Sequence, residues 1–309
     1  MLPDWPAWST TGITCERTMS GDIVVSLPIA DWNGPFDPDL GRHAVAALEA
    51  GRVVCLTGLA FTTLPEEAVL LSPALLDNSR KNISFDPASG RVSGSAEHPA
   101  LLAAMLARFA RSAESMLRGL LIPYADTLWA GRTSFRPAEI AGRAYSPRHD
   151  DRRLHVDAFP SRPIGGARIL RLFTVLPQAS AARAWRIGEP FESVAAGFLP
   201  ALPSPAPLRA RLYALLGLTK GVQSAYDQMM LALHDRMKLD ADYQRQASYT
   251  ARTFSPGSTW LCFTDQVSHA ALSGHMMLEQ TFHVPVQSML DPEQSPLRVL
   301  ERLAGRALA

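Results

Sequence analysis

Residues 248–287, SYTARTFSPGSTWLCFTDQVSHAALSGHMMLEQTFHVPVQ, decide the fold. They form short runs of strand-favouring residues separated by turn residues, and they follow a helical region. Similar short strands are predicted earlier, in TSFRPAEI, RLHVDAF, ARILRLFTVLP and RAWRIGEPFE. Many short strands separated by turns are typical of a β-sandwich or jelly roll. A parallel sheet would need strand and helix to alternate throughout the chain, which they do not.

Helices are predicted before and within this set of strands. Residues 98–121 carry apolar residues at helical spacing, and Pro123 ends the helix. A Pro-rich stretch leads into a second helical region near 205–245. We therefore predict an α+β fold with a jelly-roll core at 129–309 that contains this helical insertion. A mixed α/β region, 1–128, is expected to pack on the core so that both form one catalytic unit.

Composition excludes several classes of protein. The 309 residues are 47% hydrophobic and 19% charged, with a formal net charge of +1. This balance argues against nucleic-acid binding, which usually needs a basic surplus. Cys15, Cys55 and Cys262 form no CxxC pair, which favours a reducing compartment. The N-terminus lacks a signal-peptide pattern, and no apolar run approaches the length of roughly 20 residues that spans a bilayer.

A metal-binding pattern lies in DDRRLHVDAFPSRP, residues 150–163. His155 and Asp157 are two positions apart on a predicted strand, so their side chains share a face. His269 stands in a matching position at the end of a later strand, 112 residues after Asp157 (269 minus 157). Two histidines and one carboxylate form the facial arrangement that holds Fe(II) and leaves positions open for a cosubstrate and O2.

The remaining histidines are weaker candidates. His234 lies beside Asp235 on a predicted helix, where neighbouring side chains diverge. His149 is too close to the HxD motif to be its distal partner. His275 and His283 lie on later strands and are weaker candidates for the third ligand. His43 and His98 flank predicted helices. A zinc hydrolase would accept the same ligands, but it usually shows more compact spacing and a nearby general base.

The chain resembles the Fe(II)/2-oxoglutarate-dependent dioxygenases at HVD, 155–157, and at PGSTWLCFTDQVSHAALSG, 256–274. More specifically, it is similar to the Kdo 3-hydroxylase family in RLHVDAFPSRP, RILRLFTVLP, AWRIGEPFE, FTDQVSHAALSG and SPLRVLERLAGR. Kdo is 3-deoxy-D-manno-octulosonic acid, a sugar of lipopolysaccharide. The likeness covers most of the chain from about residue 130 to the end.

The resemblance implies a double-stranded β-helix core with Fe(II) held by His155, Asp157 and His269. It implies 2-oxoglutarate and O2 as cosubstrates, and the Kdo sugar of a lipid A precursor as substrate, at the cytoplasmic face of the inner membrane. Because halogenases of the superfamily lack the carboxylate ligand, Asp157 favours hydroxylation. Two other functions stay open: a 2-oxoglutarate-dependent hydroxylase of a protein side chain or small metabolite, and a non-catalytic jelly-roll binding module.

The sequence departs from the superfamily at the anchor for 2-oxoglutarate. Many members place Arg or Lys about one strand after the distal histidine, where this chain has Glu279 and Gln280. The anchor is therefore expected on another strand, at Arg171, Arg168 or Arg136. Arg168 and Arg171 fall on opposite faces of a regular strand, so at most one of them points inward.

Arginines surround the HxD motif. The arginines are Arg143, Arg148, Arg152, Arg153 and Arg162. Either they lie in a solvated loop and pair with Asp150 and Asp151, or they form a patch that binds the carboxylate and phosphates of a Kdo-lipid A substrate. The final helix, SPLRVLERLAGRAL at 295–308, is amphipathic and basic. It either packs on the core, as such helices usually do, or supports peripheral membrane contact.

Overall fold

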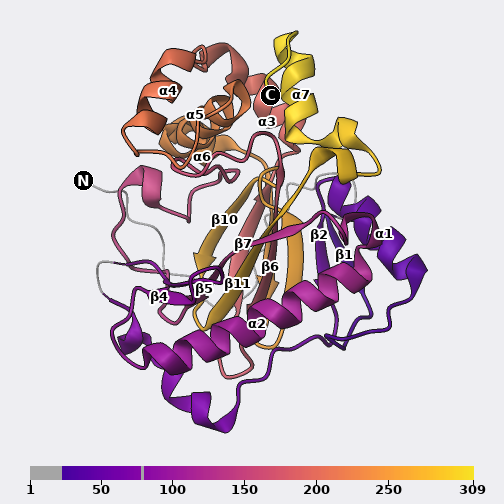
Figure 1. Ribbon diagram of the computed structural model, residues 1–309, viewed down its shortest axis with the longest axis vertical. Coiled ribbons are helices and arrows are strands. Elements are labelled where there is room, and N and C mark those ends of the chain that lie inside the picture. Colours follow the sequence, from indigo (N-terminus) through magenta and orange to yellow (C-terminus); the bar gives the residue numbers. More distant parts are fainter. Residues whose placement is uncertain (1–22, 78–79) are drawn as a thin grey trace.

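The computed structural model describes residues 23–77 and 80–309, so Cys15 and the first 22 residues lie outside the described chain. An eight-stranded sheet forms its main layer, in the order β1-β2-β9-β6-β11-β5-β3-β4 (Figure 1). Neighbouring strands are antiparallel except for β1 and β2, which are parallel. In that order the strands are Val24–Leu27, Val53–Leu56, Thr259–Phe263, Arg168–Val175, Met277–Val284, Trp129–Arg136, Ile83–Asp86 and Arg91–Ser93.

A three-stranded antiparallel sheet packs on the main sheet. It consists of β10 (His269–Ser273), β7 (Arg183–Gly188) and β8 (Tyr249–Phe254), in that order. Aromatic side chains fill the space between the sheets: the Phe254 and Trp260 rings stack with centroids 3.8 Å apart, and Trp185 meets Phe173 edge to face at 5.1 Å. Aromatic pairs of this kind add to the stability gained from apolar burial. The two layers are the jelly roll that the sequence predicts, open rather than closed into a barrel.

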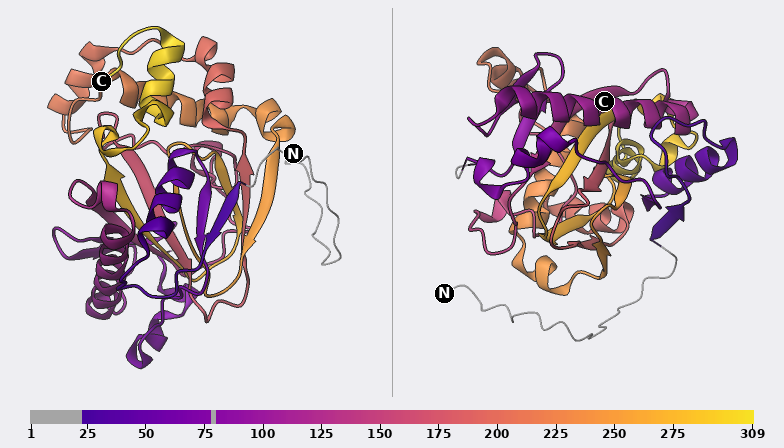
Figure 2. Two further views of the ribbon diagram at one scale, coloured as in Figure 1. Left: turned by 90° about the vertical axis from the view of Figure 1, so that its right-hand side faces the viewer. Right: turned by 90° about the horizontal axis from the view of Figure 1, so that it is seen from below.

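Two helices lie on the main sheet, α1 (Pro38–Glu49) and α2 (Pro99–Leu120), as Figures 1 and 2 show. The predicted apolar stripe of α2 is buried, including Leu102, Met105, Phe109 and Met116. Gly51 takes a φ of 72° just after α1, a conformation that glycine adopts without strain and that ends the helix there.

The remaining helices form a cap at one end of the jelly roll (Figure 1). They are α3 (Phe191–Phe198), α4 (Pro207–Leu215), α5 (Ala225–Leu239), α6 (Ala241–Gln246) and α7 (Pro296–Ala304). A second apolar cluster joins α3, α5 and α7, and includes Val156, Met230 and Leu300. Short 3₁₀ helices lie at Pro65–Leu70, Pro73–Leu75, Ile122–Tyr124, Pro147–His149, Leu199–Ala201, Val286–Ser288 and Pro292–Gln294.

Three features bear on the predicted organisation. The region before residue 128 contributes β1 to β4 to the main sheet, so it is part of the core layer as well as packing on it. RLHVDAF forms no regular strand: only His155 makes a bridge, to His269, because the chain turns away toward Pro160 and Pro163. No helix among residues 23–77 and 80–309 has the length and apolar character needed to cross a bilayer.

Candidate metal centre

The three predicted ligands lie together where the sheets meet the helical cap. His155 and His269 form an antiparallel bridge in which each amide donates to the other's carbonyl, at 3.0 and 2.9 Å. The Asp157 amide donates to the carbonyl of Thr264 at 2.8 Å. The candidate ligand atoms of the three side chains lie within 4.8 Å of one another. One cation can therefore contact all three.

Both imidazoles are oriented by backbone carbonyls. Nδ1 of His155 lies 2.8 Å from the carbonyl oxygen of Arg153, and Nδ1 of His269 lies 2.8 Å from that of Val267. A protonated Nδ1 donates to each carbonyl, which leaves Nε2 with its lone pair free for a metal. Burial lowers the pKa of both imidazoles, so they are neutral at pH 7, as ligands must be.

Asp157 supplies the negative charge of the group. Burial alone would raise the pKa of its carboxyl, but the Arg171 guanidinium and the two histidines outweigh burial and hold the pKa well below its usual range. Nε of Arg171 lies 3.3 Å from Oδ2 of Asp157. Oδ2 is buried and has no hydrogen-bond partner. The other oxygen, Oδ1, lies 3.7 Å from Nε2 of His155. An ionised carboxylate beside two free imidazole nitrogens suits Fe(II).

Basic side chains line the space next to this group. Glu279 bridges two of them, with Oε1 at 3.1 Å from Arg171 and Oε2 at 3.5 Å from Arg136. Arg136 also reaches Asp151 at 3.3 Å, and two further cations contact Asp151, namely Lys81 and Lys238. Burial would raise the pKa of Asp151, but these cations hold it well below its usual range.

Arg183 is a further cation of this space that sequence reasoning missed. It is 2% exposed, and its Nη1 donates a hydrogen bond to the carbonyl of Gly274 at 3.0 Å. Its Nε and that of Arg136 are buried without a hydrogen-bond partner. Burial and the Arg136 charge lower the pKa of Arg183 to about 9. Two buried guanidinium donors without acceptors fit an anionic ligand.

Arg168 lies on the opposite face of its strand from Arg171, as strand alternation predicts. Its side chain is fully buried, with Nε 2.8 Å from Asp265 and Nη2 2.6 Å from Gln266. Its guanidinium also lies over the ring of Phe263, 3.8 Å from the centroid. These partners occupy Arg168 within the core, whereas Arg136 and Arg171 lie beside the metal group.

Two arginines predicted to contact substrate are bound within the protein. Arg152 forms an ion pair with Asp150 of its own loop, at 2.8 Å. Nε of Arg153 donates to the backbone carbonyl of Lys238 on α5. Arg152 is therefore paired with Asp150 of its own loop, as one alternative expects. Arg153 pairs with neither Asp150 nor Asp151 and is held by a backbone carbonyl of α5 instead.

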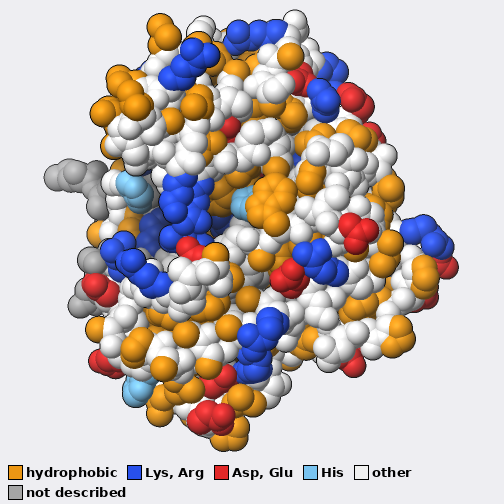
Figure 3. All heavy atoms as spheres, viewed as in Figure 1, with side chains coloured by type: hydrophobic (Ala, Val, Ile, Leu, Met, Phe, Trp, Pro, Cys, Tyr) orange, Lys and Arg blue, Asp and Glu red, His pale blue; other side chains and the backbone are white. Residues whose placement is uncertain are grey.

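The other three arginines lie nearer to solvent. Arg143 donates to a backbone carbonyl at residue 80 and lies over the ring of Tyr145. Arg148 is exposed and reaches Asp235 at 3.5 Å. Arg162 lines a groove of about 380 Å³ together with two further cations, Arg132 and Lys220. Figure 3 shows Lys and Arg side chains gathered beside a hollow below the helical cap, with a histidine in the hollow.

His234 lies closer to the metal group than its sequence position indicates. Its ring meets that of His155 edge to face, with centroids 5.4 Å apart, while its Nδ1 lies 3.0 Å from Asp235. It is not one of the three clustered ligands. His234 reaches His155 because α5 packs on the loop around His155, and no local sequence pattern predicts that contact.

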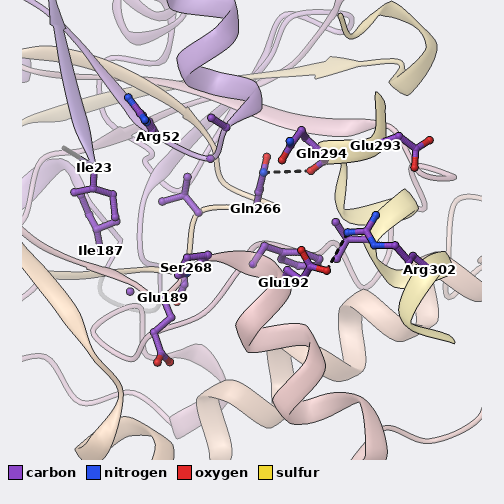
Figure 4. Close-up of a pocket in the computed structure, with 17 residues that line it drawn as sticks. Ile23, Arg52, Ile187, Glu189, Glu192, Gln266, Ser268, Glu293, Gln294 and Arg302 are labelled. Atoms are coloured by element: carbon purple, nitrogen blue, oxygen red, sulfur yellow. Dashed lines mark hydrogen bonds and ion pairs between the residues drawn. The ribbon is translucent and has the colours of Figure 1, made fainter. Parts of the chain in front are cut away.

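A separate cavity of about 370 Å³ is lined by the turn after α1, the end of β7, the start of α3 and helix α7 (Figure 4). Gln266 and Ser268 line it from the segment before β10, and an ion pair between Arg302 and Glu192, 3.0 Å long, stands at another side. Its lining includes none of the three clustered ligands. This cavity is therefore distinct from the candidate metal centre.

Comparisons with known proteins agree with this site. A family model described as 3-deoxy-D-manno-oct-2-ulosonic acid (Kdo) hydroxylase matches residues 31–307. A crystal structure of the Kdo hydroxylase KdoO, a non-haem Fe(II) α-ketoglutarate-dependent dioxygenase, with α-ketoglutarate and Fe(III) is 44% identical with a TM-score of 0.87. The KdoO complex with cobalt(II) is also 44% identical, with a TM-score of 0.88. Each match covers 93% of this chain and 97% of the other. No curated protein matches. The overlap confirms the predicted jelly-roll fold.

Proposed function

The chain belongs to the Kdo hydroxylase family, and we propose that it is an Fe(II)- and 2-oxoglutarate-dependent dioxygenase that hydroxylates Kdo on a lipid A precursor. The observation that carries this proposal is the buried group of His155, Asp157 and His269. Each imidazole presents Nε2, and the ionised Asp157 places Oδ1 3.7 Å from Nε2 of His155.

His155, Asp157 and His269 would hold Fe(II) on one face. Bound together, iron and 2-oxoglutarate supply the oxidative decarboxylation that activates O2 and replaces a substrate C–H hydrogen with hydroxyl. The protein contributes the geometry of this centre. The backbone bridge between His155 and His269 fixes the spacing of two ligands, and Arg171 keeps Asp157 ionised.

Arg136 and Arg183 are proposed to bind the distal carboxylate of 2-oxoglutarate. The Nε atom of each is buried and has no hydrogen-bond acceptor. A dicarboxylate would satisfy these donors with charge-assisted hydrogen bonds. Arg171 is proposed to position Asp157, because its Nε lies 3.3 Å from this ligand, whereas the ion pairs of Arg136 go to Asp151 and Glu279. Arg168 would hold the core together through Asp265.

The substrate is proposed to enter from the face that carries the basic hollow. Kdo bears a carboxylate and lipid A bears phosphates, so a rim rich in Lys and Arg favours their approach. The groove lined by Arg132, Arg162 and Lys220 supports this direction. Because the acceptor is a lipid, the enzyme is proposed to work at a membrane surface, at the cytoplasmic face of the inner membrane.

The test is reconstitution of the purified protein with Fe(II) under anaerobic conditions, followed by O2, 2-oxoglutarate and Kdo-bearing lipid A. Mass spectrometry of the lipid should show one added oxygen on the sugar, and none without 2-oxoglutarate. His269→Ala should lose this product, while the exposed His43→Ala should keep it.

The same experiment separates the other functions. Succinate without oxidised lipid would keep the dioxygenase and replace the substrate, by a protein side chain or a small metabolite. Absence of both products from protein that holds iron would favour the non-catalytic binding module.

A further inference from the structure

The helix α4 and the turn after it expose an unusual number of apolar side chains. We call residues 207–222 the apolar tip. They hold seven of the thirteen exposed large apolar side chains of the described residues, and two are almost fully exposed, Leu208 at 79% and Leu215 at 84%. The seven are Leu208, Leu212, Tyr213, Leu215, Leu216, Leu218 and Val222. Single exposed apolar residues are ordinary on soluble proteins, whereas a concentration of this kind marks an interaction surface.

The apolar side chains of α4 point away from the protein. Leu208, Leu212 and Leu215 follow the spacing of one helix face. Ala210 is the buried residue of α4, and at about 100° per residue it lies on the side opposite Leu208. In Figure 3 hydrophobic side chains gather over the part of the cap where Figure 1 places α4. The helix therefore turns its apolar face outward, the reverse of a helix that packs on a core.

The charge of the apolar tip is entirely positive. Arg209, Arg211 and Lys220 lie within it, and residues 207–222 contain no Asp or Glu. The ion pairs of the described chain involve none of these three cations. Unpaired cations beside exposed leucines complement a surface that is apolar inside and anionic outside, such as an anionic bilayer.

Hydrogen bonds connect the apolar tip to the loop that leaves the metal centre. The Lys220 amide donates to the carbonyl of Ser161 at 2.9 Å, and the Gln223 side chain donates to that of Pro160 at 2.9 Å. This loop begins just after Asp157. Lys220 also lines the groove that contains Arg132 and Arg162. A bilayer bound at the apolar tip would therefore lie next to the proposed route of an anionic glycolipid substrate.

We infer that the apolar tip docks the protein on an anionic lipid bilayer, with its leucines in the interface and its cations at the headgroups. The inference rests on the proposed function, since it supplies the membrane contact that a lipid-linked substrate requires. The final helix α7, the other predicted membrane element, packs inward through Leu297, Val299 and Leu300 instead.

Vesicle binding tests the inference without reference to turnover. The full-length protein is sedimented with vesicles of phosphatidylethanolamine and phosphatidylglycerol, and with vesicles of phosphatidylcholine alone. We expect binding to the anionic vesicles that weakens with salt. Leu212→Ser/Leu215→Ser/Leu218→Ser should weaken it by at least about tenfold, because each leucine loses the transfer of apolar surface into the interface. The matched control, Ile122→Ser/Leu290→Ser, also removes exposed apolar residues, at 65% and 63%, and should bind as the unmodified protein does.

A second measurement separates this inference from the proposed function. With detergent-dispersed Kdo-lipid A, the tip variant should turn over at the unmodified rate, and with vesicle-embedded substrate its rate should fall about as much as its binding. Equal vesicle binding by tip and control variants would overturn the inference, whatever the activity. A loss of self-association in the tip variant, measured by analytical ultracentrifugation, with vesicle binding intact, would also overturn it and assign the patch to a contact between copies of the chain.

Discussion

Replacing Arg183 by Met should make the ligand-free protein more stable and its cosubstrate binding weaker. The pKa of Arg183 lies at about 9 instead of 12.5. At about 1.4 kcal/mol per pH unit, its uncompensated charge costs at most roughly 5 kcal/mol. The substitution also loses the hydrogen bond to Gly274, about 1 kcal/mol. Replacement of buried charges by apolar groups stabilises proteins by about 1–4 kcal/mol in favourable cases. We therefore expect a gain of about 1–3 kcal/mol in the free energy of unfolding.

Cosubstrate binding should change in the opposite direction. A charge-assisted hydrogen bond contributes about 1.5–3 kcal/mol, so the Kd for 2-oxoglutarate should rise between about 10- and 100-fold. Thermal unfolding with and without 2-oxoglutarate, in the presence of cobalt(II), measures both effects. Arg186→Met is the control, because Arg186 lies on the same strand with its guanidinium over the ring of Tyr249. A destabilised Arg183→Met with an unchanged Kd would refute the reasoning and make Arg183 a structural residue.

Three further predictions follow from buried charges. Arg168→Met should lower the free energy of unfolding by about 3–5 kcal/mol, measured by chemical denaturation, because Asp265 is then buried without its partner. An Arg168→Met protein as stable as the unmodified one would contradict the structural role of Arg168. Burial lowers the pKa of His283 to about 4, below the value near 6.5 in the unfolded chain. The resulting contribution to stability is fully present above pH 6.5 and is lost as the pH falls toward 4. Between pH 7 and pH 5 the free energy of unfolding should fall by about 2 kcal/mol through His283. This decrease should disappear in His283→Gln and remain in His43→Gln. Asp157→Ala should weaken cobalt(II) binding by at least about 100-fold, because loss of a ligand costs more than loss of a residue that only hydrogen-bonds to a ligand. A cobalt(II) titration followed by visible absorption measures this change.

The sequence was sufficient for the features that depend on local pattern. The two-residue spacing of His155 and Asp157 predicts that their side chains lie together, and strand alternation separates Arg168 from Arg171. Both expectations agree with the contacts observed. The helical insertion near 205–245 is present as α4, α5 and α6. The clustering of His269 with His155 and Asp157 was predicted from its strand-end context, which the antiparallel bridge explains.

Other features depend on tertiary contacts that a single sequence does not encode locally. His234 reaches His155 through the docking of a helix, and the arrangement around Asp151 joins residues from distant segments. Arg183 could have been found, because it alternates with Trp185 and Ile187, whose side chains are buried between the sheets. The strand predicted around His155 is reduced to one bridge, since nearby prolines prevent a longer ladder.

The order of strands in the main sheet has a consequence for synthesis. β2, near residue 55, has its place between β1 and β9, and β9 is made only about 200 residues later. At roughly 5–20 residues per second, the ribosome takes on the order of 10–40 seconds to supply it. During that interval β1, β2 and α1 expose apolar surface that the finished protein buries. The nascent chain should therefore need chaperone protection until its last third has emerged, and a fragment that ends before β9 should aggregate.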